Sequence, residues 1–101
     1  MNIEMSSGNV YADIGAPDAE EMLLKAQLAS RIADMIQSKG FTQSQAAELL
    51  GIPQPKLSLM LRGQFRGISE AKMLECLARL GRDIQIVIGP ERAGIGNIVV
   101  V

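Results

Sequence analysis

The sequence predicts one compact, mainly α-helical domain of four to five helices with a short β-strand near its C-terminus. Three observations support this prediction. Apolar residues recur at helical spacing between residues 18 and 82, a glycine follows each of these stretches, and residues 83–88 instead alternate in hydrophobicity. The chain has 101 residues, which suits a single hydrophobic core.

The composition limits both the core and the function. Hydrophobic residues make up 48% of the chain but aromatic residues only 3%, so the core should be aliphatic and rich in methionine. One cysteine and no histidine exclude an internal disulfide framework and a cysteine–histidine zinc site. We expect Cys76 to be a half-buried packing residue. The chain also lacks a Gly-rich phosphate loop, so we expect no enzyme, no metal and no cofactor.

The localisation expected from the sequence is cytoplasmic. A single cysteine suits a reducing compartment. No apolar run reaches the length of a membrane span, and the first residues lack the basic start and apolar stretch of a signal peptide.

The chain divides into three predicted segments. Residues 1–17 should be a flexible arm, in which residues 9–14 could form a short strand. Residues 18–82 should be the helical domain. Residues 83–101 should be a strand and tail that serve dimerisation. A lone strand needs a partner, which is either residues 9–14 or the same strand of a second protomer.

The first and last helices carry local boundary signals. Asp18 with Glu21 resembles a capping box, which predicts a helix over residues 19–38 that is closed by Gly40. Ser69 should cap the last helix. Its predicted core residues are Met73, Leu74, Leu77 and Ala78.

Residues 41–67 predict two short helices joined by a tight turn. Thr42 and Gln45 have the spacing of a capping box, so a helix should begin at residue 43. Gly51 lets the chain turn sharply. The second helix, residues 54–62, opens with Pro53 and Pro55, which are tolerated in a first turn. This arrangement is a helix-turn-helix at residues 43–62.

The second helix has one packing side and one outward side. Leu57, Met60 and Leu61 cluster on the packing side. A short helix with an outward polar side fits the DNA major groove, while the preceding helix crosses the phosphate backbone. The predicted base-facing residues are Gln54, Pro55, Lys56, Ser58 and Leu59. The predicted phosphate contacts are Gln43, Ser44, Arg62 and Arg66.

The charge distribution favours this interpretation although the net charge is −1. Residues 1–38 hold two basic and six acidic side chains, whereas residues 39–82 hold seven basic and three acidic side chains. The basic charge therefore surrounds the predicted helix-turn-helix. A footprint of this size suggests that two protomers bind together.

The run T-Q-x-x-A-A-x-x-L-G-I-x-Q-P-x-x-S-x-x-L-R-G over residues 42–63 resembles the Xre/Cro-type repressors. The leader GNVYADIGAPDAEEMLLKAQLA narrows the resemblance to a subgroup that includes HigA-like antitoxins, and it extends over about residues 9–89. It implies a lambda-repressor-like bundle, a homodimer and double-stranded operator DNA, and for some members a toxin partner. Pro53 and Leu59 depart from the family pattern. The alternative function is a protein-interaction module that binds a toxin without specific DNA binding.

Overall fold

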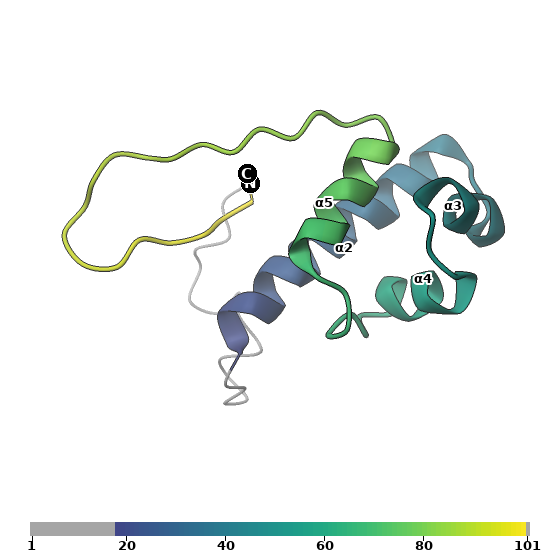
Figure 1. Cartoon of the computed structure of the whole chain (residues 1–101), viewed down its shortest axis with the longest axis horizontal. Coiled ribbons are helices and arrows are strands. Elements are labelled where there is room, and N and C mark those ends of the chain that lie inside the picture. Colours follow the sequence, from purple (N-terminus) through teal and green to yellow (C-terminus); the bar gives the residue numbers. More distant parts are fainter. Residues whose placement is uncertain (1–17, 101) are drawn as a thin grey trace.

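The computed structural model describes residues 18–100, which form four α-helices followed by an extended segment (Figure 1). The helices are α2 (Ala19–Lys39), α3 (Gln43–Leu50), α4 (Gln54–Leu61) and α5 (Glu70–Arg79). The predicted mainly α-helical class is confirmed, while the described residues contain no fifth helix. The predicted N-terminal arm, residues 1–17, lies outside the described residues.

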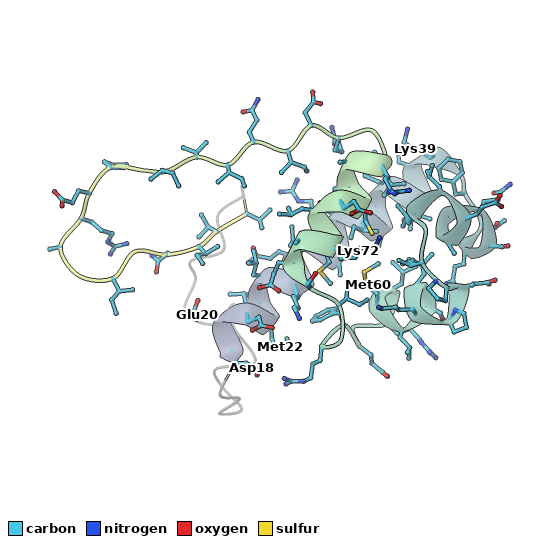
Figure 2. All side chains as sticks on the ribbon, in the orientation of Figure 1. Asp18, Glu20, Met22, Lys39, Met60 and Lys72 are labelled. Carbon is cyan, nitrogen blue, oxygen red and sulfur yellow. The ribbon has the colours of Figure 1, made fainter. Side chains whose placement is uncertain are left out.

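The long helix α2 organises the packing. Helix α5 packs along it, α4 contacts α2, and α3 packs against both α4 and α5 (Figure 1). Methionines contribute to the core as expected: Met22, Met60 and Met73 are buried, and Met60 lies between α4 and the α2–α5 pair (Figure 2). Burying one such side chain stabilises a fold by about 1.5–3 kcal/mol, which exceeds a typical surface ion pair. The core therefore holds the helices together more than the charges do.

The loop between α4 and α5, residues 62–69, belongs to the core as well. Phe65 and Ile68 are both buried, so this loop is pinned to the helices at two points. The sequence prediction did not assign either residue to the core, because an isolated apolar residue in a loop has no periodicity to reveal it. This pinned loop directly follows α4 and fixes where α4 ends.

Several predicted helix ends are confirmed. The Thr42 hydroxyl accepts from Gln45 N at 3.1 Å, and Gln45 Oε1 accepts from Thr42 N at 2.9 Å, which completes the capping box of α3. The Ser69 hydroxyl likewise accepts from Lys72 N at 3.1 Å. Helix α4 ends at Leu61, one residue earlier than predicted, and Gly63 follows with φ of 89°.

Other predictions about the helices need correction. Asp18 precedes α2 but its side chain makes no capping hydrogen bond, because it pairs with Arg66 instead. Ala78 is exposed rather than in the core. Cys76 is fully buried rather than half-buried, and this burial raises the pKa of its thiol. The buried side of α5 is therefore rotated by part of a turn from the side that the sequence spacing predicted.

The predicted β-strand over residues 83–88 is not formed. The structure describes residues 82–100, which we name the C-terminal arm, without helix or strand. No backbone hydrogen bond joins residues 83–99 to another part of the described chain. Alternating apolar residues favour an extended chain, but a strand also needs a neighbour to accept its hydrogen bonds.

Candidate nucleic-acid interface

The turn between α3 and α4 is held by local backbone hydrogen bonds. Gly51 has φ of 69°, a left-handed conformation that glycine adopts without steric cost. Its N–H donates to Glu48 O at 3.3 Å, and Ile52 N donates to Ala47 O at 3.2 Å. This is a Schellman motif, and its apolar partner Ile52 is buried. The turn therefore fixes the direction in which α4 leaves α3.

Helix α4 has a buried side and an exposed side. Leu57 and Met60 are buried, so the opposite side must face solvent. All five predicted base-facing residues lie on the accessible part of the helix. Gln54, Pro55, Lys56 and Leu59 are exposed and Ser58 is partly buried. The exposure of Leu59 is 38%, which leaves an apolar contact surface among polar neighbours.

The N-terminus of α3 offers free donors beside α4. The capping box uses the N–H groups of Thr42 and Gln45. Gln43 and Ser44 are exposed, and no acceptor among the described residues pairs with their backbone N–H groups. Unpaired N–H groups at a helix N-terminus attract anions such as phosphate. The predicted positions of Gln43 and Ser44 are thus suited to phosphate contacts.

The two predicted arginines beyond α4 differ in their surroundings. Arg62 is exposed at the end of the helix, and no carboxylate of residues 18–100 forms a salt bridge with it or with Lys56. Arg66 is also exposed, but its Nη1 donates to Asp18 Oδ2. Lys56 and Arg62 are therefore available to an anion, whereas Arg66 has to exchange its partner first.

A buried lysine behind this surface was not found by the sequence analysis. The Lys25 side chain of α2 is only 3% exposed, and its Nζ donates to Arg66 O at 3.1 Å. It also lies 3.1 Å from Glu21 and 3.8 Å from Glu70. Lys25 therefore joins α2, the loop after α4 and the start of α5. Charged residues are rarely buried unless they are paired. Two of the partners of Lys25 lie more than 40 positions along the chain, so the local sequence gives no sign of its burial.

A second tie holds α3 against α5. Arg79 Nη1 donates to Leu49 O at 3.2 Å, at the C-terminal end of α3 where carbonyls lack helical partners. Arg79 Nε also lies 3.1 Å from Glu75, which is 2.9 Å from Lys72. The hydrogen bond and positive charge of Lys72, together with the charge of Arg79, lower the pKa of Glu75. Lys72 and Arg79 are thus partly neutralised by Glu75, and Arg79 also links α5 to the end of α3.

None of the helices within residues 18–100 has the length and hydrophobicity that crossing a membrane requires.

Comparisons with known proteins agree with this geometry. A family model described as a helix-turn-helix domain matches residues 10–89. No curated protein matches the chain. One solved structure, described as an XRE-family transcriptional regulator, is 34% identical, covers 84% of this chain and 98% of its own, and superimposes with a TM-score of 0.77. The chain therefore belongs to the helix-turn-helix domain family, among the XRE-type transcriptional regulators.

Proposed function

We propose that this protein is a repressor that binds double-stranded operator DNA as a homodimer. We also propose that it acts in the cytoplasm as the antitoxin of a toxin–antitoxin operon. The observation that carries the DNA-binding part is the exposed side of α4. Gln54, Lys56 and Leu59 are accessible there while the Schellman turn fixes the helix against α3. The proposal assigns the protein no catalytic role.

The side chains of α4 would read base edges. A glutamine can form two hydrogen bonds with adenine, a lysine can donate to guanine, and an apolar side chain can contact the methyl group of thymine. Gln54, Lys56 and Leu59 offer these three chemistries on one exposed surface. Ser58, which is partly buried, and Pro55 complete this base-facing set.

The phosphate contacts would come from both sides of α4. Gln43 and Ser44 lie at the start of α3, and Arg62 and Arg66 follow the end of α4. Contacts of this kind position a protein on DNA and give its affinity a salt dependence, but they do not distinguish sequences. Two copies would place two α4 helices in successive major grooves about 34–36 Å apart.

Fluorescence anisotropy with the protein's own promoter fragment and a scrambled fragment, each at two salt concentrations, tests this proposal. Gln54→Ala should lose about 1–3 kcal/mol at one operator position only. Arg62→Ala should weaken binding to both fragments alike and flatten the salt dependence. Gln37→Ala is the matched control, because Gln37 is an exposed glutamine on α2. Equal, weak binding to both fragments by the wild-type protein would contradict the proposal.

The antitoxin role rests on the resemblance of the leader and the helix-turn-helix to HigA-like antitoxins. Its test is co-expression with the product of the neighbouring reading frame, which the proposal expects to be a small basic protein. Co-purification, together with rescue of growth from that protein, would support the role. A neighbour that is neither toxic nor retained would argue against it and leave the operator-binding proposal intact.

A further inference from the structure

The C-terminal arm exposes more apolar surface than any other part of the described chain. Its side chains stand out from the ribbon along its whole length (Figure 2). Ile86 is 77% exposed, Ile88 is 89% exposed and Ile95 is 93% exposed. The seven exposed large apolar residues of the arm are Ile84, Ile86, Val87, Ile88, Ile95, Ile98 and Val99. An exposed, β-prone segment of this kind invites pairing with another chain.

The apolar area of the arm is a substantial part of what a specific interface needs. Each such side chain offers on the order of 100 Å² of apolar surface, so the seven offer roughly 700 Å², of which the four within residues 83–89 contribute roughly 400 Å². A stable protein–protein interface buries about 800 Å² on each partner. The arm is also held at both ends, since it follows the buried Leu80 and its residue Val100 packs against the core. It can therefore present a fixed surface and not only a loose tail.

We infer that residues 83–89 pair with the same residues of a second copy of this chain, antiparallel, across a two-fold axis at Ile86. This inference deepens the homodimer of the proposed function and rests on that part of it. It identifies the surface that joins the two copies and the register in which they pair.

Symmetry restricts the register. In a two-fold symmetric antiparallel pair the axis is perpendicular to the sheet, so a residue must lie opposite its own copy. Side chains then keep their faces, and Ile84, Ile86 and Ile88 of both copies share one face. An unrelated partner strand would be under no such restriction. The three isoleucines on one face thus suit pairing of this segment with itself.

The free amide groups select the centre. Arg82 N already donates to Leu77 O at 3.1 Å, and Pro90 has no N–H. Between them, the N–H groups of residues 83–89 have no backbone acceptor among residues 18–100, and the midpoint of this segment is Ile86. This register places Asp83 opposite Gly89, Ile84 opposite Ile88, and Gln85 opposite Val87.

Neighbouring registers are less favourable. An axis at Val87 would place Asp83 opposite Glu91, and like charges at opposed positions destabilise a sheet. An axis at Gln85 would place Ile88 and Gly89 opposite Arg82 and Gly81, whose N–H groups already donate to Leu77 O and Ala78 O at the end of α5. Ile86 is the centre that avoids both problems.

Disulfide cross-linking of the full-length protein tests the register. In a Cys76→Ala background, Ile86→Cys should form a covalent dimer under mild oxidation, because opposed Cβ atoms lie about 4.5–5.5 Å apart, close to disulfide distance. Ile84→Cys and Ile88→Cys should cross-link poorly alone and efficiently when mixed. Ile95→Cys, which is even more exposed than Ile86 and lies outside the ladder, is the control. The Ile86 variant should exceed this control at least ten-fold in cross-linked fraction.

The solution mass completes the test. Light scattering should give a dimer for the wild type and for Ile95→Lys, and a monomer for Ile86→Lys at the same concentration. Equal cross-linking of the Ile86 and Ile95 variants would overturn the inference, and so would a dimer that persists in Ile86→Lys. A monomeric wild type would overturn both the inference and the homodimer. Cross-linking as expected without promoter-selective binding would uphold the inference and contradict the proposed repressor.

Discussion

The Arg66 guanidinium donates a hydrogen bond to the Asp18 carboxylate, which lies 48 positions earlier in the chain. This pair joins the start of α2 to the loop that follows α4. The side chain of Arg66 is 63% exposed, so the bond is accessible to solvent and to competing anions. The arginine is therefore shared between an internal carboxylate and any phosphate that approaches α4.

Asp18→Asn should strengthen DNA binding by releasing Arg66. Exposed ion pairs contribute at most about 1 kcal/mol, so the gain should be up to about five-fold and equal on promoter and scrambled fragments. Anisotropy titrations at two salt concentrations measure it. Glu20→Gln removes the same charge from an exposed position in the first turn of α2 and is the control. A gain of equal size in the control would show that net charge alone acts.

Lys25→Met should destabilise the fold by about 1–3 kcal/mol. Methionine keeps the buried aliphatic stem but loses the charged hydrogen bond to Arg66 O, and bonds of this type contribute about 1.5–3 kcal/mol. Urea denaturation followed by circular dichroism measures the loss. Lys72→Met removes a surface pair with Glu75 and should cost less than about 1 kcal/mol. Similar losses in both variants would contradict the role given to Lys25.

Gly51→Ala should destabilise the protein by about 1–2 kcal/mol through backbone strain, because an L-residue pays that amount in the left-handed region. Steric clash adds little, since a Cβ atom would lie 3.7 Å from Arg79 Nη1. Gly67→Ala is the matched control, because Gly67 lacks positive φ and has open space around it. Thermal unfolding of both variants should separate them. An unchanged melting temperature in Gly51→Ala would contradict the strain.

Glu75→Gln should remove part of the acid sensitivity of the fold. Lys72 and Arg79 lower the pKa of Glu75, so its ionised form is favoured in the folded state. The stabilisation is present at neutral pH, above the pKa of an unfolded glutamate, and is lost as pH falls through the lowered folded-state pKa. Melting temperatures from pH 7 to pH 2 should therefore converge for the wild type and the variant in acid. A constant difference would contradict the coupling.

Local signals explain how much of the fold could be predicted. The Thr42–Gln45 capping box and the turn at Gly51 involve residues at most a few positions apart, so the sequence displays them directly. Asp18 also had the sequence form of a cap, but its side chain found Arg66, far along the chain. Lys25 is also buried through a distant partner, because its side chain donates to Arg66 O, 41 positions along the chain. Local spacing does not reveal contacts between residues far apart in the sequence, so the prediction for Asp18 failed and the burial of Lys25 was missed.

The candidate site shows a similar division. The exposed side of α4 follows from the periodicity of Leu57 and Met60, so its predicted residues are accessible in the structure. Whether they contact bases stays a prediction. The partner of Arg66 could not be predicted, and the strand at residues 83–88 failed because alternation specifies a strand only together with a neighbour. What depends on one helix was predictable, and what depends on two segments was not.

The capping box of α3 and the prolines at the start of α4 have a thermodynamic consequence. The capping box closes the start of α3, Pro53 restricts the backbone at the N-cap of α4, and Pro55 restricts it within the first turn of α4. The helices α3 and α4 would therefore already be ordered before DNA binds. Calorimetric titration with DNA should then give a heat-capacity change that reflects surface burial alone, without the large contribution that accompanies coupled folding.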